Sequence, residues 1–223
     1  EWLLQLPGDQ ASIWSDRLTF FLGSFWVQQG YGWIFPMAHN QLKVGVCRLI
    51  DPRRCQPPLT AELAKVLQAA DLQTATVLDR HGGRIRSSVR RREPHQKGRL
   101  IGLGDVVSTA NLLGGEGIRH ALTSSRVLAP LLQEALQSPS QAERILERYP
   151  RQLRQALGWR WSLSGRLARR TWLGLSNAKA DQRLERLLNG LQTKRAEDLS
   201  ALLFDYRFER YGLKALPYLW ARS

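Results

Sequence analysis

The 223-residue sequence has few cysteines and no long apolar run. Cys47 and Cys55 lack the spacing of a metal-ligand pair, so we expect two structural thiols in a reducing compartment. The longest apolar candidate, residues 18–27, contains a glycine and a serine and is half the roughly 20 residues that a membrane-spanning helix requires. The pattern of a secretory signal, a charged segment followed by an apolar one, is also missing. We therefore expect a cytoplasmic protein.

Signatures of hydrolytic and metal-dependent enzymes are missing as well. The sequence contains no G-x-S-x-G, H-E-x-x-H, phosphate-binding loop or C-x-x-C. Its four histidines show neither metal-ligand nor nucleophile spacing, so we expect no metal site and no hydrolysis. The dinucleotide-binding pattern G-x-G-x-x-G is also absent from these residues.

Positive charge is present in excess, with 33 lysines and arginines, 19 acidic residues and a formal net charge of +14. Eight basic residues lie between Arg80 and Arg99 against the single acid Glu93, and six arginines lie between Arg151 and Arg170 with no acid. Such clusters suit nucleic acid, anionic lipid headgroups or phosphorylated small molecules, and a solvated face is the plainer alternative. No recognised nucleic-acid-binding motif accompanies them, so we expect no nucleic-acid partner.

The hydrophobic pattern changes along the chain from strand-like to helical. It predicts strands over 18–21, 24–27, 30–36, 41–49, 75–78, 83–89 and 100–103, with a hairpin turn near Asn40. A helix of about a dozen residues is expected from Leu59, with Thr60 as its N-cap. Further helices are expected over 118–137, which Pro130 should kink or break, and over 140–149, 153–159, 181–191, 196–203 and 206–220. The fold class is α+β, with an antiparallel sheet, one βα unit and a helical C-terminal region.

The segment from Arg99 to Ile118 has the pattern of a ligand-binding turn. An apolar run ends at Gly104-Asp105, and a loop then brings Gly114-Gly115-Glu116-Gly117 to the start of a helical pattern. The glycines let a backbone approach a ligand, and a helix N-terminus offers free N–H groups and a partial positive charge. Asp105 is placed to accept hydrogen bonds from hydroxyl groups. The alternative is a plain strand-to-helix turn with a capping aspartate.

A second segment, Tyr31-Gly32-Trp33-Ile34-Phe35-Pro36, is followed after eight residues by Gly45-Val46-Cys47. In a strand, Tyr31, Trp33 and Phe35 point to one face, and Pro36 is expected to stop the strand. Three rings on one face suit the wall of a cavity for a long apolar chain. Read alone, such residues more often belong to a core.

Together the two segments resemble motifs of the geranylgeranyl reductase family, flavoproteins built like p-hydroxybenzoate hydroxylase. That family reads G-D-A-A-G, six residues and G-E-G-I, and also Y-x-W-x-F-P followed by G-x-G. Here Val106-Val107-Ser108 replaces A-A-G, Leu112 stands at the usual proline, and Cys47 replaces the second glycine.

The resemblance implies an FAD site and a substrate site. Asp105 would bind the ribityl chain, and Gly115, Glu116, Gly117 and Ile118 would surround the isoalloxazine ring. Gly104 and Gly114 complete the expected cofactor-binding set. The residues expected to hold the isoprenoid, on a sheet that covers the flavin, are Tyr31, Trp33, Phe35, Pro36 and Gly45.

The fold then implied is a partial FAD/NAD(P)-binding α/β fold, read as the C-terminal portion of a longer flavoprotein or a fragment. Its expected domains are a β-rich substrate-binding domain (1–96), a piece of the FAD-binding domain (97–137) and a helical region (138–223). The implied activity is hydride transfer from reduced flavin to an isoprenoid C=C bond, with NAD(P)H or a reduced electron carrier as donor. No catalytic residue is assigned. The alternatives are a monooxygenase or carotenoid cyclase of the same fold, and an inactive fragment that binds no flavin alone.

The basic and aromatic residues outside these motifs suggest a peripheral contact with an anionic membrane, on its cytoplasmic face. Arg90, Arg91 and Arg92 would hold a pyrophosphate headgroup or lie against anionic lipid. The arginine-rich tail also carries tryptophans that suit a membrane interface or, alternatively, an internal core: Trp159, Trp161, Trp172 and Trp220.

Overall fold

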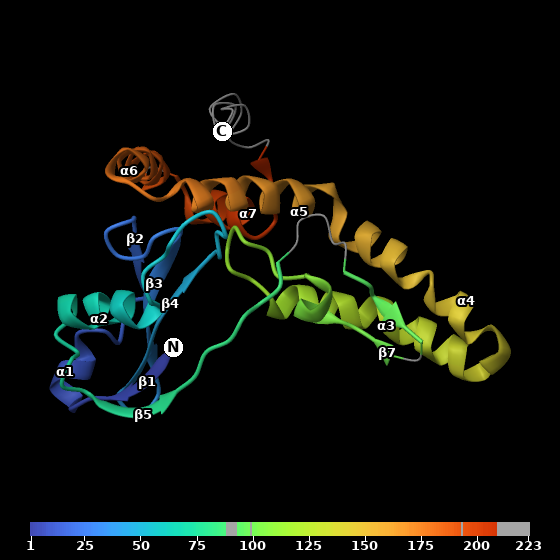
Figure 1. The fold of residues 1–223 in the computed structure, drawn as a ribbon. Coiled ribbons are helices and arrows are strands. Elements are labelled where there is room, and N and C mark those ends of the chain that lie inside the picture. The colour runs from blue at the N-terminus through green and yellow to red at the C-terminus, as the bar shows by residue number, and fades with distance from the viewer. Residues whose placement is uncertain (88–92, 99, 193, 209–223) are drawn as a thin grey trace. The chain divides into compact units, whose positions relative to one another are not determined.

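The computed structural model describes residues 1–87, 93–98, 100–192 and 194–208 (Figure 1). These form two compact units, a sheet unit and a helical unit. The sheet unit contains residues 1–83 and 170–192, and the helical unit contains the described residues of 84–169 and 194–208. The division into three domains stays a prediction; residues 138–223, expected as one region, contribute to both units. Arg90, Arg91, Arg92, Arg99 and Trp220 lie outside the described residues.

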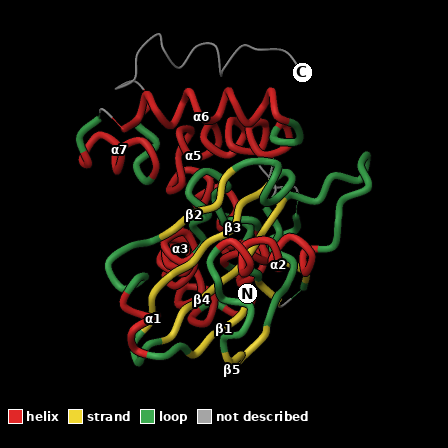
Figure 2. Tube along the Cα trace, turned by 90° about the vertical axis from the view of Figure 1, so that its left-hand side faces the viewer, coloured by secondary structure: helices red, strands yellow, loops and turns green. Residues whose placement is uncertain are grey.

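The sheet unit is built on five antiparallel strands in the order β2-β3-β4-β1-β5, drawn in yellow in Figure 2. The strands are β1 (Trp2–Gln5), β2 (Thr19–Leu22), β3 (Gly30–Met37), β4 (Gln41–Arg48) and β5 (Thr76–Arg80). The β3–β4 hairpin turns near Asn40 as expected, and both His39 and Asn40 have positive φ there. Asparagine tolerates this conformation better than most residues, which explains its place in the turn.

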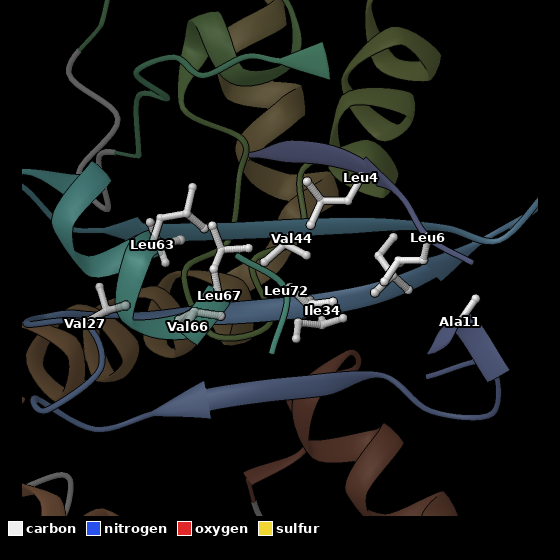
Figure 3. Packing of buried hydrophobic residues seen from close by; sticks show 12 residues of the cluster. Leu4, Leu6, Ala11, Val27, Ile34, Val44, Leu63, Val66, Leu67 and Leu72 are labelled. Carbon is white, nitrogen blue, oxygen red and sulfur yellow. The ribbon is translucent and has the colours of Figure 1, made fainter. Parts of the chain in front are cut away.

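One face of the sheet carries the hydrophobic core of its unit. Because side chains alternate along a strand, Ile34 of β3 and Val44 of β4 share this face and oppose each other in register. Helix α2 (Leu59–Ala69) covers the face with Leu63, Val66 and Leu67, which recur at helical spacing (Figure 3). The short helix α1 (Gly8–Ser12) adds Ala11 to the same cluster.

Residues 170–192 belong to the sheet unit through hydrogen bonds to the segment between β2 and β3. The amide of Gln29 donates to the carbonyl of Leu175 at 2.8 Å, and its side chain donates to the carbonyl of Leu173 at 3.0 Å. Ser24 donates from its amide and hydroxyl to Asp181 of α6 (Ala178–Gln192) at 2.8 and 2.7 Å.

The helical unit contains a two-stranded sheet and short and long helices. Its elements are β6 (Gln96–Lys97), β7 (Leu100–Ile101), η1 (Gly104–Val107), α3 (Ile118–Gln137), η2 (Pro139–Gln141), α4 (Ala142–Leu146), most of α5 (Tyr149–Gly174) and α7 (Ala196–Leu203). The core of this unit consists of buried side chains from η1, α3, α4 and α5: Val107, Leu128, Leu131, Ala135, Ile145, Leu146, Tyr149 and Leu153.

The mixed α+β class is confirmed, but several expected elements are wrong. Residues 24–27 form a turn instead of a strand, with Trp26 and Val27 donating to the carbonyl of Gly23. Residues 83–87 have no regular structure, and 88–89 lie outside the described residues. Helix α2 starts at Leu59 without a side-chain cap from Thr60. The strand expected over 100–103 is only the two-residue β7, paired antiparallel with β6.

The prolines act differently from expectation in two elements. Helix α3 runs continuously through Pro130, which is exposed, so the carbonyl it leaves without a donor is open to water. Strand β3 continues past Pro36 to Met37. Strand β2 pairs with β3 only as far as Ile34, so Pro36 lies beside an open edge, where a sheet tolerates proline.

Candidate functional site

The turn that carries Asp105 is held against helix α3. Asp105 lies in η1, the 3-10 helix over Gly104–Val107, instead of directly after a long strand. The amide of Gly104 donates to Oγ of Ser124 in α3 at 3.0 Å. The Ser124 hydroxyl lies 2.6 Å from the hydroxyl of Tyr149, so a buried polar chain fixes the turn on two helices.

The Asp105 carboxylate lies against Gly117, the residue that immediately precedes α3. A methyl group at Gly117 would lie 3.1 Å from Oδ1 and 3.2 Å from Oδ2 of Asp105, so only glycine permits this approach without a shift. Oδ1 is buried and has no hydrogen-bond partner among the residues that the structure describes. Because an unpaired buried acceptor costs free energy, the position fits a ligand that brings hydroxyl donors, as a ribityl chain does.

Two further polar atoms of this turn are buried without a hydrogen-bond partner in the described part of the chain: Oγ of Ser108 and Oγ1 of Thr109. Both residues are fully buried. The sequence did not single them out as candidate ligand contacts, because an isolated Ser-Thr pair carries no pattern of its own.

The glycine-rich loop is closed by backbone and side-chain hydrogen bonds. The amide of Asn111 donates to the carbonyl of Glu116 at 2.8 Å, and Oδ1 of Asn111 accepts from the amide of Leu113 at 2.9 Å. The Asn111 side chain also donates to the carbonyl of Trp161 and to Oγ of Ser164, at 3.2 and 2.6 Å. The loop then leads to α3, which begins at Ile118 as expected.

The Glu116 side chain points into the protein and binds the segment after α7. Its carboxylate forms a two-point ion pair with Arg119, at 2.9 Å for each contact, and accepts from the hydroxyl of Tyr206. Nε2 of His120 lies 2.8 Å from the same hydroxyl. The set is satisfied when His120 donates to Tyr206 and Tyr206 donates to Glu116. The side chain of Glu116 is therefore occupied, and the loop backbone is what remains for a ligand.

Burial controls the ionisation of this cluster. Burial lowers the pKa of His120, with the positive charge of Arg119 acting in the same direction and the Glu116 carboxylate opposing it. Burial also raises the pKa of Tyr206, and its hydrogen bond to Glu116 adds to this shift. At neutral pH both groups are uncharged. Of the cluster, the sequence singled out Glu116 but gave no signal for Tyr206, which lies 90 residues after Glu116.

The aromatic residues of β3 lie together on the sheet face opposite the core, as expected. Ring centroids are 5.8 Å apart for Tyr31 and Trp33 and 6.2 Å apart for Trp33 and Phe35. Two rings that the sequence did not assign to this set extend it: Phe20 of β2, at 5.4 Å from Phe35, and Trp172 of α5, at 5.2 Å from Tyr31. These five rings are called the aromatic face below.

Gly45 explains the spacing between the aromatic motif and the glycine that follows it. Gly45 pairs with Trp33 across the β3–β4 ladder. A methyl group at Gly45 would lie 2.3 Å from Cζ2 of Trp33, so the indole lies directly over the glycine. Cys47, which stands where the family has a second glycine, pairs with Tyr31, and burial raises the pKa of its thiol.

The tryptophans of the arginine-rich tail divide between surface and interior. Trp161 is buried, Trp159 is 67% exposed, and Trp172 joins the aromatic face.

Across the described ranges, none of the helices combines the length and apolar character needed to cross a bilayer. The same residues contain no histidine, cysteine and carboxylate cluster suited to a metal ion.

Comparisons with known proteins agree with the motifs. No family model matches the chain. A digeranylgeranylglycerophospholipid reductase of Methanocella arvoryzae is 25% identical over 147 residues, which cover 66% of this chain and 37% of the relative. Digeranylgeranylglycerophospholipid reductase 1 of Methanococcoides burtonii is 23% identical over 150 residues, or 67% of this chain and 35% of the relative.

A solved structure shows a similar fold. A geranylgeranyl bacteriochlorophyll reductase-like protein of Thermoplasma acidophilum matches with a TM-score of 0.66 and 20% identity, over 94% of this chain and 52% of that one. These similarities support a geranylgeranyl reductase-like family. The chain spans about a third of the length of the curated relatives it matches, and about half of the structural neighbour.

The packing of Trp33 on Gly45 predicts the effect of one methyl group. Gly45→Ala should destabilise the sheet unit by roughly 1–3 kcal/mol because the indole must move. Urea unfolding monitored by circular dichroism measures the change in the free energy of unfolding. The penalty should largely disappear when the ring is removed by Trp33→Leu. Gly83→Ala, a site with no atom nearby, serves as control; an equal penalty with and without the Trp33→Leu substitution would show that the ring contact is not the cause.

The buried His120 predicts a pH dependence of stability. The pKa of His120 is lower in the folded protein than in the unfolded chain, where it is about 6.5. As pH falls below about 6.5, the unfolded chain takes up a proton more readily than the folded protein, so the folded protein becomes less stable. The melting temperature should therefore decrease between about pH 7 and pH 5, and less so in His120→Gln. A wild-type slope in His120→Gln would exclude this origin.

Proposed function

We propose that the chain acts as part of an FAD-dependent reductase that acts on an isoprenoid C=C bond. The observation that carries the proposal is the buried Oδ1 of Asp105, without a partner in the described residues, beside the start of α3. The names of the curated relatives support the reductase class and a geranylgeranyl lipid substrate.

The residues present fit the flavin. Asp105 would accept hydrogen bonds from ribityl hydroxyls, and the backbone from Gly115 to Ile118 would face the ring. The N-terminus of α3 would stabilise negative charge on reduced flavin by about 0.3–1 kcal/mol. Val106, larger than the family's alanine, is 66% exposed and lies beside Gly102, so its added bulk lies at the surface. When bound, FAD supplies the hydride, and NAD(P)H or a reduced carrier is the expected electron source.

The aromatic face would hold the apolar chain of the substrate. Tyr31, Trp33 and Phe35 are only partly buried, and Phe20 is exposed, so their rings offer apolar surface that the core does not use. Gly45 keeps this surface flat by letting Trp33 lie close to the strand. A peripheral contact with anionic lipid completes the proposal, since the net charge of +14 favours such surfaces.

A monooxygenase or a carotenoid cyclase of the same fold would use the same flavin contacts. A reductase is favoured over these because both curated relatives carry reductase names. An inactive fragment differs from all three in binding no flavin.

Riboflavin tests the proposed contact because it contains the ring and the ribityl chain but no pyrophosphate. Riboflavin should bind more tightly than lumiflavin, which lacks the ribityl hydroxyls. Asp105→Ala should weaken riboflavin binding by roughly tenfold, the size expected for a hydrogen bond to a charged group, and leave lumiflavin unchanged. Quenching of flavin fluorescence measures both affinities.

The matched control is Glu143→Ala, which removes an exposed carboxylate from α4 of the same unit. It should leave both affinities unchanged. Absence of riboflavin binding, or equal riboflavin affinity in wild type and Asp105→Ala, would contradict the assignment.

A further inference from the structure

A cavity of about 860 Å³ lies in the helical unit, next to the glycine-rich loop but lined by other residues. Its walls come from the first three turns of α3, from residues 156–160 of α5 and from residues 204–207 after α7. None of Gly104, Asp105 or residues 114–118 lines it. The cavity therefore needs an explanation of its own.

The walls of this cavity, called the arginine cavity, carry strong positive charge. Four arginines line it, Arg119, Arg126, Arg160 and Arg207, and Asp205 is the one carboxylate among its lining residues. Arg119 is already bound to Glu116. Arg126 and Arg207 are exposed, and neither forms an ion pair within the described part of the chain. Two guanidinium groups are thus available to an anion, and guanidinium suits phosphate through paired hydrogen bonds.

Apolar side chains lie among these charges. Leu122 of α3 and Trp159 of α5 are 63% and 67% exposed, and Phe204 is also exposed. The guanidinium of Arg160 lies 5.6 Å from the ring centroid of Trp159. A free inorganic anion would leave this apolar surface in water. A ligand with a phosphate at one end and a hydrocarbon at the other would satisfy both features.

We propose that the arginine cavity binds the phosphate group of an amphiphile whose hydrocarbon part lies against Trp159 and Leu122. The inference does not depend on the proposed flavin chemistry, because no residue of the flavin site takes part. It assigns part of the excess positive charge of the chain to one site, the arginine cavity, and to one class of ligand, phosphorylated lipid.

Calorimetric titration of the full chain with geranyl diphosphate, inorganic diphosphate and geraniol tests the proposal. Geranyl diphosphate should bind most tightly. Arg126→Gln combined with Arg207→Gln should weaken its binding by about 100-fold, roughly tenfold for each guanidinium contact. Trp159→Ala should weaken binding of geranyl diphosphate but not of inorganic diphosphate.

The matched control combines Arg151→Gln with Arg154→Gln, two exposed arginines of α5 outside the cavity, and removes the same charge. It should leave affinity within about twofold of wild type, allowing for weak long-range electrostatics. Equal loss in both double variants would overturn the proposal in favour of diffuse charge attraction. Geraniol binding as tight as geranyl diphosphate, or no binding of either, would also overturn it.

Vesicles identify the source of the phosphate group. If the ligand is a membrane lipid, the wild-type protein should sediment with vesicles containing phosphatidic acid, and the Arg126/Arg207 double variant should not. Binding of geranyl diphosphate without vesicle binding would support the cavity and assign it to a monomeric phosphorylated isoprenoid. Riboflavin affinity should be unchanged in the double variant, so failure here and failure of the flavin proposal are distinguishable.

Discussion

The close approach of the Asp105 carboxylate to Gly117 is the constraint on which the candidate cofactor site depends. Glycine at position 117 permits it without a shift, and the Gly104–Ser124 hydrogen bond holds the turn in place. An acid at this position is favoured by the partial positive charge of the helix N-terminus. Oδ1 has no partner among the described residues, and in the proposed function it would accept a hydrogen bond from the ligand.

The neighbouring loop shows how protein contacts leave a backbone free for binding. Arg119 and Tyr206 bind the Glu116 side chain, and Asn111 closes the loop. The residues after α7 therefore stabilise the same loop that would face a flavin. In the sheet unit, Gly45 has a comparable role, since it lets Trp33 lie flat on its neighbouring strand. In both units a glycine permits the contact that shapes the candidate surface.

The sequence predicted features that depend on local pattern. The β3–β4 hairpin, the shared face of Tyr31, Trp33 and Phe35, and the start of α3 at Ile118 all follow from spacing that holds over a few residues. The hydrophobic pattern failed to predict structure where contacts with residues far away in the sequence determine the conformation. Residues 24–27 have strand-forming side chains, yet Ser24 binds Asp181, 157 residues away, and the segment turns. Tyr206 and Trp172 join their clusters from similarly distant positions, which no local pattern indicates.

Glycine amides can report whether the start of α3 binds a flavin ring and its ribityl chain. Selective ¹⁵N labelling of the 18 glycines gives a simple correlation spectrum for titration with riboflavin. If flavin binds there, the resonances of Gly115 and Gly117 should shift, and those of Gly45 in the sheet unit and Gly158 at the arginine cavity should not. Unchanged Gly115 and Gly117 resonances at saturating riboflavin would contradict binding there.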